Sequence, residues 1–213
     1  MKKLIIFDYD GVIVDSFPAL HEVYQEMCQS LGKDCPKSLE EFKKIYGHRS
    51  SEAYENLGFS EDEVLLGNKF YKENIIKKNV QPFEGIIETI KELAKSYNMV
   101  VVSSCPTNVI EIKLDELGIS KYFKEIIGRE KIGPKWFEKA GSIKTAVEKH
   151  STTENTISIG DRNIDFIEGV KAGLKNILLV DYGGGYDLSL IPEYKQKTKV
   201  TSPKELIEAI KQF

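Results

Sequence analysis

The feature that most constrains the fold is a short apolar run that ends in two aspartates. Residues 4–7, Leu-Ile-Ile-Phe, are apolar at every position, and Asp8 and Asp10 follow them directly. A run without polar alternation predicts a strand that is buried on both faces, as in a parallel sheet. Asp8 then lies at the carboxyl end of this strand, which is the edge where open α/β sheets bind their ligands.

The spacing of the two aspartates indicates a charged site. Asp8 and Asp10 are two residues apart, so their side chains point the same way in an extended backbone. Two adjacent carboxylates repel each other unless a cation or a proton separates them. Gly11 allows the chain to turn sharply beside them. The pattern therefore predicts a site for cation binding or proton transfer, with a simple acidic turn as the alternative.

The remainder of the chain alternates between strand and helix patterns. Further apolar runs predict strands at 99–102, 123–128, 156–159 and 176–180. Helical periodicity lies between them, including a helix over about 142–149 and one through Phe166 and Val170. Such alternation predicts an α/β fold with a doubly wound parallel sheet and right-handed crossovers.

Residues 17–80 interrupt this alternation with helical patterns alone. Asp15 or Ser16 is a candidate cap for the first helix. Ser38 stands three residues before Glu41, as in a capping box, and Ser60-Glu61-Asp62-Glu63 is typical of a third helix start. We expect a small all-helical domain over 17–80, inserted into a core domain formed by 1–16 and 81–213. A chain of 213 residues is long enough for this division.

Charge and cysteine content narrow the functional classes. The net charge of −3 gives no indication of a nucleic acid or an anionic membrane as partner. The apolar run at 4–7 is too short for a signal peptide or a membrane span. Cys28, Cys35 and Cys105 have no metal-binding spacing, which favours reduced thiols. We expect a cytoplasmic protein that is a monomer or a small homo-oligomer.

Two motifs carry a resemblance to a known family. The stretch Asp8-Tyr9-Asp10-Gly11-Val12, with Asp15-Ser16 after it, resembles the first motif of the haloacid dehalogenase (HAD) superfamily phosphohydrolases, Asp-x-Asp-Gly-x-x-x-Asp-Ser. Gly160-Asp161 with Asp165 resembles the fourth motif, Gly-Asp-x-x-x-Asp. The chain is most similar to the subgroup of phosphoglycolate phosphatase and β-phosphoglucomutase. The resemblance implies a Rossmann-like core with a helical cap over 17–80.

The same resemblance implies roles for the acidic residues. Asp8 would be the nucleophile that attacks phosphorus, and Asp10 would be the general acid/base. Asp8, Asp161 and the backbone carbonyl of Asp10 would hold Mg²⁺, which prefers oxygen ligands. Asp165 would be a further ligand or a partner that orients the ligands.

The resemblance also implies substrate-binding residues, but the motifs that carry them are less specific than the two motifs that carry the aspartates. Ser103 and the backbone N–H of Ser104 follow the second strand and would bind the phosphoryl group. The usual Lys-Pro-x-Pro motif is absent, so the phosphoryl-binding lysine is assigned to Lys139, with Lys135 as the alternative. Arg49 lies in a polar loop of the cap, where it would contact the leaving group or belong to an ordinary exposed turn.

These features together predict a Mg²⁺-dependent phosphatase that acts on a small phosphorylated metabolite through an aspartyl-phosphate. A mutase that returns the phosphoryl group to a sugar phosphate remains an alternative, as does a non-catalytic protein that binds a phosphorylated ligand. A dehalogenase would need neither Asp10 nor a metal site. No motif identifies the substrate.

Overall fold

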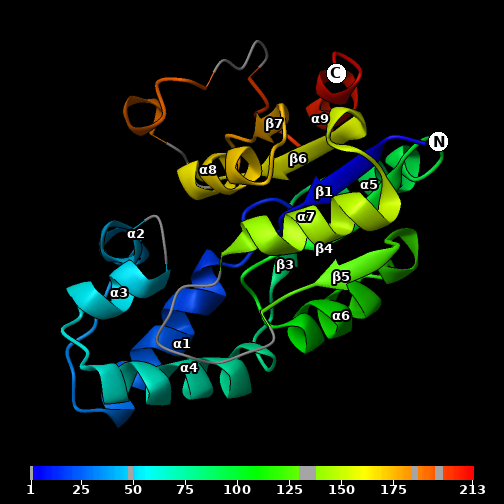
Figure 1. The fold of residues 1–213 in the computed structure, drawn as a ribbon. Coiled ribbons are helices and arrows are strands. Elements are labelled where there is room, and N and C mark those ends of the chain that lie inside the picture. The colour runs from blue at the N-terminus through cyan, green and yellow to red at the C-terminus, as the bar shows by residue number, and fades with distance from the viewer. Residues whose placement is uncertain (1, 48–49, 130–137, 184–186, 195–198) are drawn as a thin grey trace.

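A parallel five-stranded sheet forms the centre of the molecule, as Figure 1 shows for the computed structural model. The structure describes residues 2–47, 50–129, 138–183, 187–194 and 199–213. The strands run in the order β5-β4-β1-β6-β7, and every neighbouring pair is parallel. Their bounds are β1 Leu4–Phe7, β4 Asn98–Val102, β5 Glu125–Ile127, β6 Thr156–Gly160 and β7 Asn176–Leu179. The predicted doubly wound sheet is confirmed, with β1 in the middle.

Helices cover both faces of this sheet because β1 is apolar on both. Ile5 and Phe7 pack in one hydrophobic cluster, whereas Leu4 and Ile6 pack in a second cluster on the opposite face. The first face carries α5 (Ile86–Leu93), α6 (Thr107–Glu116) and α9 (Glu205–Ile210), and the second carries α7 (Lys139–His150) and α8 (Asn163–Lys171). Short 3-10 helices span Ser120–Tyr122, Thr153–Asn155 and Leu188–Leu190.

The described residues between 16 and 81 contain four helices, which form a separate group in Figure 1 beyond the carboxyl ends of the strands. They are α1 (Phe17–Ser30), α2 (Leu39–Tyr46), α3 (Ser50–Asn56) and α4 (Glu61–Ile75). Their interior is aromatic: the ring of Phe42, which is fully buried, lies 5.1 Å from that of Tyr24 and 5.5 Å from that of Tyr46. We call residues 17–80 the helical segment. Its status as a domain of its own stays a prediction.

A small antiparallel sheet lies where the chain enters and leaves the helical segment. Strand β2 (Val14–Asp15) pairs with β3 (Gln81–Pro82), so the two connections are joined to each other. The backbone of Phe83 continues the ladder by donating to the carbonyl of Ile13 at 3.1 Å. This pairing fixes the exit and the return of the chain next to the Asp8 turn. Within the part of the chain that the structure describes, no helix has the length and apolarity that crossing a membrane requires.

The predicted capping box at Ser38 is confirmed, and the predicted helix start at Ser60 has a capping box as well. In the box that begins α4, the N–H of Glu63 donates to Oγ of Ser60 at 3.4 Å, and the N–H of Ser60 donates to the Glu63 carboxylate at 2.7 Å. The box at Ser38 has the same pattern. These bonds satisfy backbone N–H groups that the helix itself cannot pair.

We expect Ser60→Ala to lower the free energy of unfolding by about 1 kcal/mol, because the first turn of α4 loses its side-chain acceptor. For a chain of this size, that loss corresponds to a drop in melting temperature of roughly 2–4 °C. Ser96→Ala is the matched control, because Ser96 is exposed and lies outside any helix. Differential scanning calorimetry of both variants tests the prediction, and equal melting temperatures would contradict it.

Candidate active site

The turn after β1 holds Asp8 in a fixed orientation. The N–H of Tyr9 donates to Oδ1 of Asp8 at 2.7 Å, and Asp8 is 8% exposed. The chain turns at Gly11, where φ is +76° and a Cβ would lie 2.1 Å from Oδ2 of Asp161. Glycine is therefore required here for two reasons, since its φ is left-handed and the Asp161 carboxylate fills the space beside it.

Lys139 connects two carboxylates in the centre of the site. Its ammonium donates to Oδ2 of Asp8 at 2.5 Å and to Oδ1 of Asp165 at 2.7 Å, and the lysine is 5% exposed. Burial favours the neutral amine, but the two carboxylates outweigh it and raise the pKa of Lys139. Lys139 is therefore a buried cation within reach of whatever binds at Asp8. Lys135, the alternative lysine, lies outside the described residues.

The connection from β6 to α8 supplies Asp161, and the first turn of α8 supplies Asp165. The N–H groups of Asp161 and Arg162 donate to Oδ2 of Asp165 at 3.2 and 3.1 Å. Because Lys139 occupies the other oxygen of Asp165, both of its oxygens are engaged. Oδ2 of Asp161, by contrast, is buried without a hydrogen-bond partner, and the nearest cation is Nε of Arg162 at 3.7 Å. Of these two residues, Asp161 is the one with an oxygen available for a ligand.

The acidic cluster fits a hard divalent cation. One oxygen from each of Asp8, Asp161 and Asp165 lies within 4.8 Å of the others. Burial, followed by repulsion from the neighbouring carboxylates, raises the pKa of Asp8 to about 6 and that of Asp161 to about 8, although Lys139 and Arg162 oppose the rise. A buried group of like charges with one unpartnered oxygen is stabilised when a cation binds, and all-oxygen ligands suit Mg²⁺. The residues present therefore fit the predicted metal.

Asp10 lies beside this cluster and has a separate environment. Burial raises the pKa of the Asp10 carboxyl, while the hydroxyl of Ser16, which hydrogen bonds to it, and the charge of Arg162 lower it. Ser16 makes no side-chain cap on α1, so the predicted capping role of Ser16 is wrong and its hydroxyl serves Asp10 instead. A carboxyl with a raised pKa next to a nucleophile is suited to donate a proton.

The two serines after β4 border the same cavity as the carboxylates. This cavity has a volume of about 50 Å³ and includes Asp8, Lys139, Ser103 and Ser104 in its wall. Oγ of Ser103 accepts from the N–H of Cys105 at 3.3 Å, which leaves its O–H as a donor toward the cavity. The structure thus brings together Asp8, Asp10, Ser103, Ser104, Lys139, Asp161 and Asp165. Arg49, the remaining predicted residue, lies outside the described residues.

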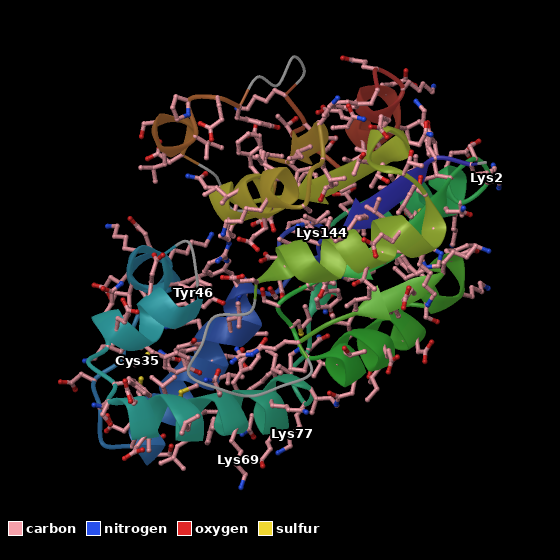
Figure 2. The ribbon with its side chains drawn as sticks, in the orientation of Figure 1. Lys2, Cys35, Tyr46, Lys69, Lys77 and Lys144 are labelled. Carbon is pink, nitrogen blue, oxygen red and sulfur yellow. The ribbon has the colours of Figure 1, made fainter. Side chains whose placement is uncertain are left out.

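Four residues of the cavity wall, Leu20, Tyr46, Arg162 and Ile164, were not assigned from the sequence, and two of them, Tyr46 and Arg162, carry polar groups. The guanidinium of Arg162 lies over the rings of Phe17 and Tyr46, at 5.2 and 4.8 Å from their centroids. Figure 2 shows Tyr46 on the side of the helical segment that is turned toward the sheet, and it lines the cavity together with Asp8. Arg162 stands inside the Gly-Asp-x-x-x-Asp motif, so its position was a usable signal. Tyr46 carried no such signal, because only tertiary packing brings it to the site.

Comparisons with known proteins agree with this fold. A family model described as haloacid dehalogenase-like hydrolase matches residues 5–179. A phosphoglycolate phosphatase of Aquifex aeolicus is 26% identical to this chain, and the match covers 97% of this chain and 95% of that protein. Phosphoglycolate phosphatase 1 of Pseudomonas aeruginosa is 23% identical, and the match covers 82% of this chain and 68% of that protein. A predicted phosphatase from Clostridium acetobutylicum has the same fold, with a TM-score of 0.86 and 23% identity over 100% of both chains.

Proposed function

Because this chain belongs to the haloacid dehalogenase-like hydrolase family and is a phosphohydrolase, we propose that it cleaves the phosphate monoester of a small metabolite through an aspartyl-phosphate on Asp8. The observation that carries the proposal is the buried contact of Lys139 with both Asp8 and Asp165 at the cavity. Around it stand a nucleophile, a proton donor and a hydroxyl donor, which are the groups that phosphoryl transfer requires.

In the first half of the reaction, an oxygen of Asp8 attacks phosphorus. The bond from Asp8 to phosphorus forms while the bond from phosphorus to the leaving oxygen breaks. The N–H of Tyr9 and the ammonium of Lys139 hold the carboxylate in place, so little reorientation is needed. Asp10 gives its proton to the leaving oxygen, which departs as an alcohol.

In the second half, water attacks the phosphorus of the aspartyl-phosphate. Asp10, now ionised, takes a proton from this water, and the carboxylate of Asp8 is regenerated as inorganic phosphate departs. The hydroxyl of Ser103, the backbone N–H of Ser104 and the ammonium of Lys139 stabilise the phosphoryl oxygens throughout. When Mg²⁺ is bound by Asp8, Asp161 and the carbonyl of Asp10, with Asp165 as a ligand or an orienting group, it neutralises charge that develops on those oxygens.

The relatives support a small phosphorylated acid or ester as the substrate class. Phosphoglycolate phosphatases are among them, as is a pyrophosphatase PpaX of Listeria welshimeri. In this proposal, residues 17–80 act as a cap that limits access of water to the aspartyl-phosphate. The free thiols of Cys28, Cys35 and Cys105 support a cytoplasmic location, and we propose a monomer or a small homo-oligomer without nucleic-acid or membrane partners.

A phosphate-release screen tests the proposed function. The purified protein is incubated with phosphoglycolate, pyrophosphate, sugar phosphates, nucleotides and amino-acid phosphates, with Mg²⁺ and then with a chelator. We expect release from at least one small ester, and at least a tenfold loss in chelator that added Mg²⁺ restores, because the acidic cluster lacks its counter-ion without metal. Full activity in chelator would contradict the metal assignment. Isomerised sugar phosphate without free phosphate would indicate a mutase.

A further inference from the structure

Helix α7 begins at the lysine of the site, but its own sequence holds that start weakly. Lys139 is the first residue of α7, and Glu138 before it makes no side-chain cap on the helix. Ala140 and Gly141 follow, so the first turn has no proline to preorganise it and contains a poor helix former instead. Because the first N–H groups of a helix have no partner within the helix, this start depends on an acceptor from elsewhere in the fold.

Glu168 of α8 supplies that acceptor. Its Oε2 accepts from the N–H of Ala140 at 3.0 Å, and its Oε1 accepts from the ammonium of Lys171 at 2.8 Å. The residue is 1% exposed. Burial of a carboxylate is costly even when it is paired, and an apolar side chain in such a place is often at least as stabilising. A buried glutamate at the start of α7 therefore indicates a role beyond packing.

The first turns of α8 hold Lys139 at both of its ends. Asp165 and Glu168 are three residues apart, so they share one face of α8. Asp165 accepts from the ammonium of Lys139 at 2.7 Å, whereas Glu168 accepts from the backbone N–H of the next residue. The two helices cover the same face of the sheet, as Figure 1 shows. Since a lysine side chain is a flexible four-carbon stem, both attachments are needed to fix the position of its ammonium.

We propose that Glu168 is a positioning residue for Lys139, an inference that rests on the proposed phosphatase function. Glu168 does not border the cavity around Asp8, so it acts through the start of α7 and touches no reacting atom. Its carboxylate fixes the backbone from which Lys139 extends to Asp8 and to the phosphoryl oxygens. A displacement of about 1 Å in such a group can lower the rate by about 100-fold.

The variant Glu168→Met tests the role, because methionine is similar in length and has no oxygen for the N–H of Ala140. We expect kcat for p-nitrophenyl phosphate to fall by about 10- to 100-fold, with circular dichroism unchanged. Glu168→Gln keeps an acceptor oxygen and should restore kcat to within about threefold of wild type. Lys171→Met is the matched control and should change kcat by less than about twofold, because Lys171 is half exposed. A wild-type kcat in Glu168→Met would overturn the proposal.

A double-mutant cycle shows whether Glu168 acts through Lys139. In a Lys139→Met background, Glu168→Met should lower kcat by less than about twofold further, because the group that it positions is already gone. Losses that multiply in the double variant would show a structural role independent of Lys139, and that outcome would overturn the proposal.

Chemical labelling separates this inference from the proposed function. The rate at which a water-soluble N-hydroxysuccinimide ester acetylates each lysine is measured by peptide mass spectrometry, without turnover. Lys139 is 5% exposed and should be labelled about tenfold faster in Glu168→Met than in the wild type, since the helix start opens more often without its cap. Lys113 on α6, which is 8% exposed, is the reference for opening of the whole fold and should keep its rate.

The labelling rates decide the proposal whatever the activity. An unchanged rate at Lys139, or an equal acceleration at Lys113, would overturn the positioning role even where the wild-type protein is an active phosphatase. Faster labelling of Lys139 alone, in a protein that hydrolyses none of the esters of the screen, would leave the placement of Lys139 by Glu168 standing and refute the phosphatase function.

Discussion

Asp8→Asn should reduce phosphate release by at least about 10⁴-fold, since the amide cannot attack phosphorus and no covalent intermediate can form. The substitution keeps the shape of a side chain whose Oδ1 accepts from the N–H of Tyr9, so the turn after β1 should be retained. Circular dichroism of the variant checks that the fold persists. Normal turnover by folded Asp8→Asn would refute the nucleophile assignment.

Asp10→Asn should differ from Asp8→Asn in kind as well as in degree. It leaves the nucleophile in place and removes the proton carrier, a loss of roughly 10²–10⁴-fold in turnover. With p-nitrophenyl phosphate, whose leaving group needs little protonation, Asp10→Asn should still form the aspartyl-phosphate but hydrolyse it slowly.

Rapid-quench mass spectrometry distinguishes the two carboxylates. A phosphorylated peptide that contains Asp8 should accumulate in Asp10→Asn and be absent from Asp8→Asn. The chemical shift of phosphorus in the quenched peptide separates an acyl phosphate from a phosphoserine. Phosphate on Ser103 or on a histidine would overturn the mechanism.

The strands were predictable because their signal is local. Leu4–Phe7 is apolar on both faces, and its burial on both sides of the sheet follows directly from that pattern. The start of α7 was not predictable in the same way. The sequence placed this helix at about Ser142, but it begins at Lys139, where the N–H of Ala140 donates to the carboxylate of Glu168. A cap that comes from another helix leaves no local pattern.

The site residues that belong to sequence motifs were predictable, and the site residues outside such motifs were not. Asp8, Asp10 and Asp161 stand at fixed places in two motifs, and the parallel sheet brings β1 and β6 side by side, so their carboxyl ends meet. Tyr46 reaches the site only through the packing of the helical segment against the sheet. Its helix has an ordinary amphipathic pattern, in which an inward-facing polar residue has no signature of its own.

Lys139→Met should cut kcat by about 10²–10³-fold, because methionine is similar in length but cannot neutralise the phosphoryl oxygens or hold Asp8. The substitution also leaves two buried carboxylates without their shared cation, at 2.5 and 2.7 Å in the wild type. Breaking a buried ion pair in this way typically costs about 3–5 kcal/mol of unfolding free energy. Lys144→Met is the matched control, since Lys144 lies on the same helix and is exposed, as Figure 2 shows.

The stability loss in Lys139→Met should depend on pH, with a sign that follows from Asp8. The folded-state pKa of Asp8 is already raised from 3.8 to about 6 with the lysine present, and removing the lysine raises it further. A carboxyl whose pKa is higher in the folded state contributes stability below its unfolded pKa and loses that contribution as the pH rises through the folded pKa. Urea denaturation in chelator should therefore show a larger gap between wild type and Lys139→Met at pH 8 than at pH 5, with no such trend for Lys144→Met. A gap independent of pH would mean that the charge of Lys139 does not stabilise the ionised form of Asp8. In the kinetic comparison, a greater loss of kcat in Lys135→Met than in Lys139→Met would assign the phosphoryl-binding role to Lys135.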